Sequence, residues 1–206
     1  MADAATPGLP DHPDAPWQGS LFGHQSPALA PLDPSRIWLD HESWIDRQAT
    51  WLLGGDRLCH DLQTALPWEA GRRPMYDRMV DVPRLVWFSD KPEQRVEGLA
   101  DLRRRFEDHY CRRIRSVSAN WYRDGQDSVE IHPDRVPRPG DTIVAILSLG
   151  GRRPVVVKPD NGGPSQRFVL GHGDLFVMGG PFQATHQHGV PKVTHSEPRI
   201  SVMFRT

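Results

Sequence analysis

The spacing of hydrophobic residues changes along the chain from a helical period to a period of two. Within Ile37–Leu66, the residues Trp44, Gln48 and Trp51 are separated by helical steps. The pair Gly54-Gly55 is a plausible helix end, because glycine is typical of the position just after a helix. We therefore expect mainly helical structure in this segment.

A second helical segment follows an irregular stretch. Prolines and arginines dominate from Pro67-Trp68 through the run 72–76 to Val82-Pro83-Arg84, which predicts a loop. After the loop, apolar residues recur at intervals of three and four, with arginines on the opposite side. This second amphipathic helix includes Leu99, Leu102, Phe106 and Tyr110.

From about Ser116 the pattern alternates with a period of two, which is typical of strands. Turn signals such as Pro139-Gly140-Asp141 and Asn161-Gly162-Gly163 separate the apolar runs. We expect strands at 143–149, 153–158, 166–170, 174–178 and 199–205. Several short strands at close spacing indicate a β-sandwich or a double-stranded β-helix, the jelly-roll architecture.

The 206 residues fit one domain with a tail. Residues 1–35 contain seven prolines and no lysine or arginine, so we expect an irregular N-terminal arm. Residues 36–115 are expected to form helical support with an irregular loop region, and residues 116–206 the strand-rich core. The predicted fold class is α+β, with a double-stranded β-helix braced by N-terminal helices.

Composition excludes several classes of protein. The formal net charge of −1 provides no global basic field for nucleic acid, so such a contact must come from a local patch. Two cysteines are too few for a disulfide framework. The chain shows no apolar run long enough to span a membrane and no secretory signal. We expect a soluble cytoplasmic monomer.

Three side chains form a candidate metal site. In a strand, His132 and Asp134 point to the same face because their positions differ by two. His188, from a later strand, would complete a set of two histidines and one carboxylate, which leaves coordination positions open and is typical of non-haem Fe(II) oxygenases. The alternative is a surface turn, with His188 a polar loop residue.

The C-terminal strand carries two arginines on one face. Arg199, Ser201, Met203 and Arg205 alternate with the apolar face formed by residues 200, 202 and 204. Arginines that face a barrel interior require anionic partners, and forked hydrogen bonds would suit a small dicarboxylate. An edge strand with two solvated arginines is the alternative.

The order of motifs from Asn120 to Arg205 resembles the AlkB family of Fe(II)- and 2-oxoglutarate-dependent dioxygenases. The region 74–84 is similar, more loosely, to the family's nucleotide-recognition part. The motifs of the core are Asn120-x-Tyr122-x-x-Gly125, His132-x-Asp134, Ser148-Leu149-Gly150, His172-Gly173-Asp174, Met178-x-Gly180, His188-x-Val190-Pro191 and Arg199-x5-Arg205.

The resemblance implies an oxidative demethylase that repairs N-alkylated bases in DNA, or in RNA. It implies Fe(II), the co-substrate 2-oxoglutarate and O2, with formaldehyde, succinate and CO2 as products. A base inside a duplex would have to be flipped out to reach the site. The alternative is a 2-oxoglutarate dioxygenase that acts on a protein side chain or a small metabolite.

The resemblance also assigns roles to residues. It makes His132, Asp134 and His188 the iron ligands, in preference to His186. It places Arg199 at the distal carboxylate of 2-oxoglutarate with Tyr122 nearby, and Asn120 and Arg205 near the metal-chelating end. Ser201 is also expected to bind the co-substrate. Expected substrate contacts are Met75, Tyr76 and Arg135.

Two features leave the mode of substrate recognition open. Ile131 and Val136 stand where relatives often have an aromatic and an acidic residue, so the preferred base is open. A cluster of arginines around the second helix could hold phosphates, and the alternative is a solvated helix face. The cluster is Arg103, Arg104, Arg105, Arg112, Arg113 and Arg115.

Overall fold

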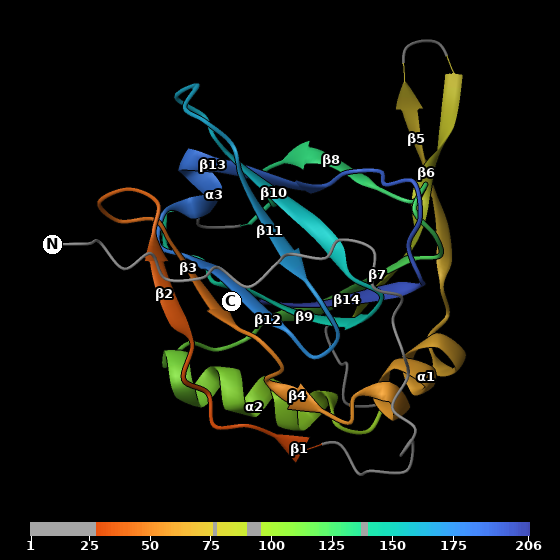
Figure 1. Cartoon of the computed structure of the whole chain (residues 1–206), viewed down its shortest axis with the longest axis horizontal. Helices are drawn as coiled ribbons and strands as arrows, with labels where there is room; N and C mark the ends of the chain where they lie inside the picture. The colour runs from red at the N-terminus through yellow and green to blue at the C-terminus, as the bar shows by residue number, and fades with distance from the viewer. Residues whose placement is uncertain (1–27, 76–77, 90–95, 137–139) are drawn as a thin grey trace, which may run out of the picture.

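A computed structural model describes residues 28–75, 78–89, 96–136 and 140–206, with the side chains of 72–81 left out. Within these ranges the strands form an eight-stranded, a four-stranded and a two-stranded sheet (Figure 1). The strand pairs are antiparallel. The two larger sheets face each other across a common interior, which confirms the predicted jelly-roll core with few helices.

The eight-stranded sheet contains segments from both halves of the chain. Its order is β2 (Ser35–Trp38), β3 (Trp44–Gln48), β12 (Leu175–Gly179), β9 (Val144–Gly150), β14 (Arg199–Arg205), β7 (Ser116–Tyr122), β6 (Arg78–Ser89) and β5 (Glu69–Met75). The predicted boundary at residue 115, between the support region and the core, therefore falls within one sheet. The division of the chain into these regions stays a prediction.

The smaller sheets complete the barrel and one corner. The four-stranded sheet has the order β11 (Gln166–Leu170), β10 (Arg153–Pro159), β13 (His186–Val190) and β8 (Val129–His132). The short strands β1 (Ala28–Leu29) and β4 (Leu52–Leu53) form the third sheet. A single helical turn, α3 (Phe182–Thr185), leads into β13.

The eight-stranded sheet is covered on both faces, so β9 is buried throughout its length. Val144 and Ile146 face the interior between the sheets. Ala145, Leu147 and Leu149 face the opposite side. A strand covered on both faces has an almost continuous apolar sequence, which explains the run Val-Ala-Ile-Leu at this position.

Two helices cover the outer face of the eight-stranded sheet. They are α1 (Asp56–Ala65) and α2 (Leu99–Tyr110), and the second was expected from its apolar spacing. On α2, Phe106 packs against Trp51 and against Phe204 of β14, with ring centroids 5.0 and 4.9 Å away. The predicted bracing of the sheet by helices is thus confirmed, on the face away from the barrel interior.

The helical prediction for Ile37–Leu66 is wrong in its first half. Residues 44–48 form β3, which pairs with β12 on one side and β2 on the other. Because Trp44, Ile45 and Asp46 are all buried, the strand lacks the alternation that would have identified it. Gly54-Gly55 precedes a helix instead of ending one, since Gly55 is the N-cap residue of α1.

The predicted loop at 72–84 is also wrong, because this segment is a hairpin of β5 and β6. Pro74 is compatible with a strand here because β5 is an edge strand of the sheet. Only 85–89 of β6 also pair with β7. The rest of β6 pairs with β5 alone, and this two-stranded ribbon extends beyond the barrel (Figure 1).

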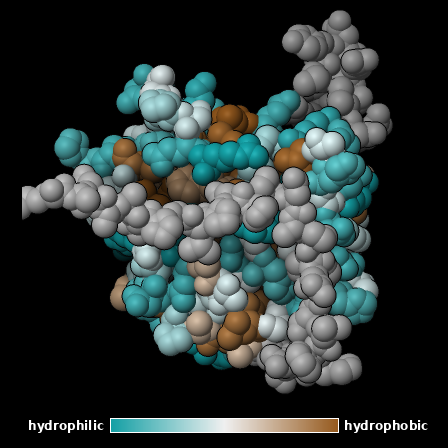
Figure 2. All heavy atoms as spheres, in the orientation of Figure 1, coloured by the Kyte–Doolittle hydropathy of each residue, from teal (hydrophilic) through white to brown (hydrophobic). Residues whose placement is uncertain are grey.

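Hydrophilic residues cover most of the coloured surface in one view, with hydrophobic residues in small separated groups (Figure 2). Over the described ranges, the helices are too short and too polar to cross a bilayer. The predictions of a monomer and of a cytoplasmic location stay predictions.

Replacement of Phe106 by alanine should test how strongly α2 holds the sheet. Phe106 is 1% exposed, so the change removes contacts to two aromatic rings and leaves a cavity. We expect the free energy of unfolding to fall by about 3–5 kcal/mol, measured by urea denaturation. Arg105→Ala, at an exposed position of the same helix, is the control and should change it by less than about 0.5 kcal/mol.

Candidate active site

Two neighbouring strands of the four-stranded sheet bring the predicted metal ligands together. His132 ends β8, and His188 lies directly opposite it on β13. Asp134 lies two residues beyond the end of β8. Ligand atoms of the three side chains lie within 4.8 Å of one another. This spacing suits one small cation with open coordination positions, which is the arrangement of the facial triad.

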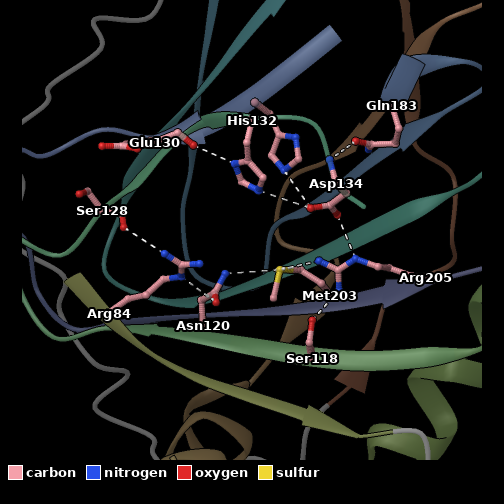
Figure 3. A network of polar contacts seen from close by, with 11 residues as sticks. Arg84, Ser118, Asn120, Ser128, Glu130, His132, Asp134, Gln183, Met203 and Arg205 are labelled. Atoms are coloured by element: carbon pink, nitrogen blue, oxygen red, sulfur yellow. Dashed lines mark hydrogen bonds and ion pairs between the residues drawn. The ribbon is translucent and has the colours of Figure 1, made fainter. Parts of the chain in front are cut away.

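Hydrogen bonds orient the candidate ligands (Figure 3). The Nδ1 atom of His132 lies 2.8 Å from the carbonyl oxygen of Glu130, and only a protonated Nδ1 can donate to that oxygen. The lone pair of Nε2 is then free to bind a metal. The Nε2 atoms of His132 and His188 lie 3.6 and 3.9 Å from Oδ1 of Asp134.

The backbone of Asp134 is held by a side chain from a distant segment. Its N–H donates to Oε1 of Gln183, on α3, over 2.7 Å (Figure 3). Its carboxylate accepts a hydrogen bond from Nε of Arg205 over 2.9 Å, and Arg205 also donates to Oγ of Ser118. The contact joins the candidate metal ligand to the arginine face of β14.

The electrostatics of Asp134 and His188 favour the forms that bind a cation, whereas those of His132 favour its protonated form. Burial raises the pKa of Asp134, but the interactions with His132, Arg205 and His188 outweigh it and hold this pKa well below its usual range. Complete burial lowers the pKa of His188 to about 4. The Asp134 carboxylate raises the pKa of His132, against the effect of burial. At neutral pH the site therefore contains an ionised carboxylate and a neutral His188.

His186 lies two residues from His188 but has other neighbours. Its Nδ1 lies 2.8 Å from Oγ1 of Thr185, and its ring stacks on Phe182 with centroids 5.2 Å apart. Within the described ranges, the group of side chains close enough to share a cation includes His188 and not His186. The geometry thus agrees with the preference for His188.

A pocket of about 190 Å³ opens beside the candidate ligands. It is lined by residues of both larger sheets, and its polar lining comes mostly from β7 and β14. The polar lining residues are Arg84, Ser118, Asn120, Tyr122, His132, Asp134, His188, Arg199, Ser201 and Arg205. The expected interior face of β14 is confirmed, since Arg199, Ser201, Met203 and Arg205 all line this pocket.

Arg199 has the properties of a binding group for an anion. It is 1% exposed, and its Nε donates to Oγ of Ser148 over 2.9 Å. Its two terminal nitrogens are buried and have no hydrogen-bond partner within the described part of the chain. Burial is the main cause that lowers its pKa. A buried guanidinium with two unused donors fits one carboxylate of a small diacid, which two parallel hydrogen bonds would bind.

The structure brings together most of the predicted site residues. The three candidate ligands and all five residues expected at the co-substrate line one pocket. Of the expected substrate contacts, Arg135 is exposed and follows Asp134, and Met75 is the last residue of β5. Tyr76 and the side chain of Met75 lie outside the described residues.

Three residues of the site were missed by the sequence prediction. Ser118, on β7, lines the pocket and accepts a hydrogen bond from Arg205. Arg84, on β6, lines the pocket and donates to Oδ1 of Asn120 over 3.0 Å (Figure 3). Gln183 orients Asp134 from a separate segment. The sequence places Arg84, directly after Pro83, only at the end of a predicted loop. No periodic pattern in the sequence indicates a role for Gln183.

The arginine cluster lies away from the pocket. Helix α2 packs on the outer face of the eight-stranded sheet, opposite the interior that contains the site. Arg103 and Arg104 pair with acidic residues on the same helix, and Arg112 pairs with Asp141 at 3.0 Å. These contacts favour the alternative of a solvated helix face.

Comparisons with known proteins agree with this geometry. Residues 54–205 match the 2OG-Fe(II) oxygenase superfamily. The chain is 31% identical to alpha-ketoglutarate-dependent dioxygenase alkB homolog 3 of Mus musculus, over 87% of this chain and 68% of the relative. For the same protein of Homo sapiens the identity is 32%, with the same coverage.

A solved structure, that of OsALKBH1, has a similar fold. Its TM-score is 0.59 at 13% identity, and the match covers 84% of this chain and 100% of that structure. At this identity the likeness concerns the fold alone. The sequence matches show that the chain belongs to the AlkB family of Fe(II)- and 2-oxoglutarate-dependent dioxygenases.

Proposed function

We propose that this protein is an oxidative demethylase that removes alkyl groups from nitrogen atoms of bases in DNA, or in RNA. The observation that carries the proposal is the pocket itself. It combines a two-histidine, one-carboxylate cluster with a buried arginine that has two unused donors. Membership of the AlkB family supports the class of substrate.

In this proposal His132, Asp134 and His188 hold Fe(II). When bound with 2-oxoglutarate and O2, the metal supplies the oxidation of the alkyl group, and the products are formaldehyde, succinate and CO2. The protein contributes a neutral His188, an ionised Asp134 and fixed ring orientations. Arg205 keeps Asp134 in place by its hydrogen bond, so the ligand is oriented before the metal binds.

Arg199 binds the distal carboxylate of 2-oxoglutarate, with Tyr122 beside it. The guanidinium of Arg199 lies 5.3 Å from the centre of the Tyr122 ring. Asn120, Ser201 and Arg205 line the pocket between this end and the metal ligands. The two ends of the co-substrate are thereby recognised separately, which orients its 2-oxo acid group toward the histidines.

The β5–β6 ribbon contacts the nucleic acid. It extends beyond the barrel (Figure 1), and Arg84 of β6 reaches the pocket lining. A base has to leave its stack to enter a pocket of this size, and an aromatic side chain can then stack on it. The proposed substrate contacts are Met75, the last residue of β5, Tyr76, which follows it in the sequence, and Arg135, which follows Asp134.

The ligand assignment is tested with His188→Ala and His186→Ala. Loss of His188 should weaken Fe(II) binding by more than about tenfold, because even loss of an outer partner of a ligand costs 10–100-fold. His186→Ala is the matched control, two residues away on the same strand, and should bind Fe(II) as the wild type does. Anaerobic titration with Fe(II) measures both. Loss of metal binding in the control alone would overturn the assignment.

The co-substrate assignment is tested with Arg199→Ala. Removal of one partner of a desolvated charge pair costs about 2–5 kcal/mol, so 2-oxoglutarate should bind tens- to thousands-fold more weakly. The affinity for alkylated oligonucleotides should change far less. Calorimetric titration with each ligand separates the two effects. An unchanged 2-oxoglutarate isotherm would exclude Arg199 from the binding site.

The substrate class is tested by succinate release. We expect release to rise when single-stranded DNA or RNA with N-methylated bases is added, and formaldehyde to form in equal amount. The same oligonucleotide without methyl groups and the Asp134→Ala variant are the controls. Stimulation by peptides or small metabolites, without stimulation by any methylated oligonucleotide, would support the alternative substrate classes and contradict the proposal.

A further inference from the structure

A second arginine is buried near the proposed 2-oxoglutarate site. Arg153, the first residue of β10, is 0% exposed. Its terminal nitrogens donate to the backbone carbonyl oxygens of Asp124, Asp127 and Pro191, at 2.8, 2.6 and 2.9 Å. All three acceptors are neutral, so these bonds do not neutralise the charge, and the buried Nε of Arg153 has no hydrogen-bond partner within the described ranges.

The nearby acidic side chain of Asp127 has another partner. Its two carboxylate oxygens accept hydrogen bonds from Nε and a terminal nitrogen of Arg123, at 2.8 and 2.9 Å. Within the described ranges, Arg153 forms no ion pair of its own. Burial lowers its pKa, and the nearby Tyr122, Asp127 and Asp124 offset this only in part. A buried cation without a paired anion is unfavourable, and such groups are common where a ligand provides the missing charge.

Arg153 and Arg199 meet at the ring of Tyr122. Their guanidinium centres lie 5.4 and 5.3 Å from the centroid of that ring, which is 2% exposed. Arg199 lies opposite Tyr122 in the β14–β7 ladder, whereas Arg153 approaches from the four-stranded sheet. Two positive charges from opposite sheets therefore lie beside the Tyr122 ring. Arg199 and Tyr122 line the pocket, and Arg153 lies behind them, outside the lining. The charge of Arg153 also lowers the pKa of Arg199, as does burial.

The three carbonyl contacts fix the ends of two strands that carry site residues. Asp124 and Asp127 belong to the turn after β7, which ends at Tyr122. Pro191 directly follows β13, which carries His188. One planar guanidinium thus connects the strand end behind the co-substrate with the strand end behind a metal ligand.

We propose that Arg153 is a positioning residue that gives the site its selectivity for a dicarboxylate co-substrate. It holds Tyr122 in place and adds a second buried positive charge behind Arg199. The distal carboxylate of 2-oxoglutarate is then the anion that both arginines lack. A 2-oxo acid without that carboxylate leaves both charges uncompensated and is rejected. The inference rests on the assignment of Arg199 under the proposed function.

The experiment compares two co-substrates that differ in one group. 2-Oxoglutarate and 2-oxopentanoate have the same carbon chain, and only the first has a distal carboxylate. Each is titrated into anaerobic, Fe(II)-loaded full-length protein by calorimetry, so the readout is binding and not turnover. The variants are Arg153→Met, Arg153→Gln and Arg153→Lys. Met and Gln remove the charge, and Gln keeps a donor for one of the carbonyls.

We expect both neutral variants to lose about tenfold in affinity for 2-oxoglutarate, the size of one screened charge interaction, and less than about threefold for 2-oxopentanoate. Arg153→Lys should restore most of the preference, because it keeps the charge. Equal losses for both ligands, or no loss for either, would contradict the proposal. Failure of both neutral variants to fold would also contradict it, since Arg153 would then be required for the fold itself.

Two controls separate this inference from its basis. Arg36→Met removes a different sheet arginine, which pairs with Asp46 at 2.7 Å outside the pocket, and should not change the ratio of the two affinities. Arg199→Met tests the assignment on which the inference rests. If Arg199→Met lowers the affinity for 2-oxoglutarate and the neutral Arg153 variants do not, only the role of Arg153 is wrong. If neither residue matters, the assignment of Arg199 fails as well.

Discussion

The active site depends on one constraint, the burial of arginine side chains on the inner face of β14. Arg199 and Arg205 lie in a barrel interior whose apolar residues include Ile146, Val155 and Met203. Burial of a cation in such surroundings is unfavourable unless an anion compensates it. The protein provides an internal anion for Arg205, the Asp134 carboxylate, and none within the described residues for Arg199. This difference divides the pocket into a structural end at the metal ligands and an open end for an external carboxylate.

The register of two ladders keeps these arginines on the inner face. β14 pairs along its whole length with β7 on one side and with β9 on the other. A slip of one residue would turn Arg199 and Arg205 toward the helices and Ile200, Val202 and Phe204 toward the pocket. Packing of Phe204 against Phe106 opposes such a slip, because α2 would lose its aromatic contact. The helices on the outer face thus stabilise the site without contributing a residue to it.

The sequence predicts the parts of this fold whose side chains have clearly different environments on their two sides. α2 buries one side only, and β14 has an apolar face toward the helices and a polar face toward the pocket. The residues predicted for both elements agree with the structure to within a residue. β3 was not identified, because Trp44, Ile45 and Asp46 are buried on both faces, while Trp44, Gln48 and Trp51 are separated by helical steps. The β5–β6 ribbon was missed because arginines and prolines indicate a loop, and because its strands are stabilised by pairing at a sheet edge. The residues proposed for the metal and the co-substrate line one pocket, as the periodicity of β14 and the family motifs predicted, although Asp134 lies beyond the end of β8 and not in a strand. Gln183, Arg84 and Arg153 could not, since each acts through a contact between segments distant in sequence.

The contact between Arg205 and Asp134 links the two halves of the site. Arg205 lies on the strand that carries Arg199, and Asp134 follows the strand that carries His132. Any anion that approaches Arg205 competes with Asp134 for its donors, and any cation that binds Asp134 weakens its hold on Arg205. On the proposed assignments, binding of the metal and binding of the co-substrate are therefore energetically coupled, and linkage makes this coupling reciprocal. Gln183 accepts a hydrogen bond from the backbone N–H of Asp134 and so fixes the chain at the carboxylate that takes part in this coupling. The ion pair of Arg205 and Asp134 is thereby suited to a function, because both residues line the pocket.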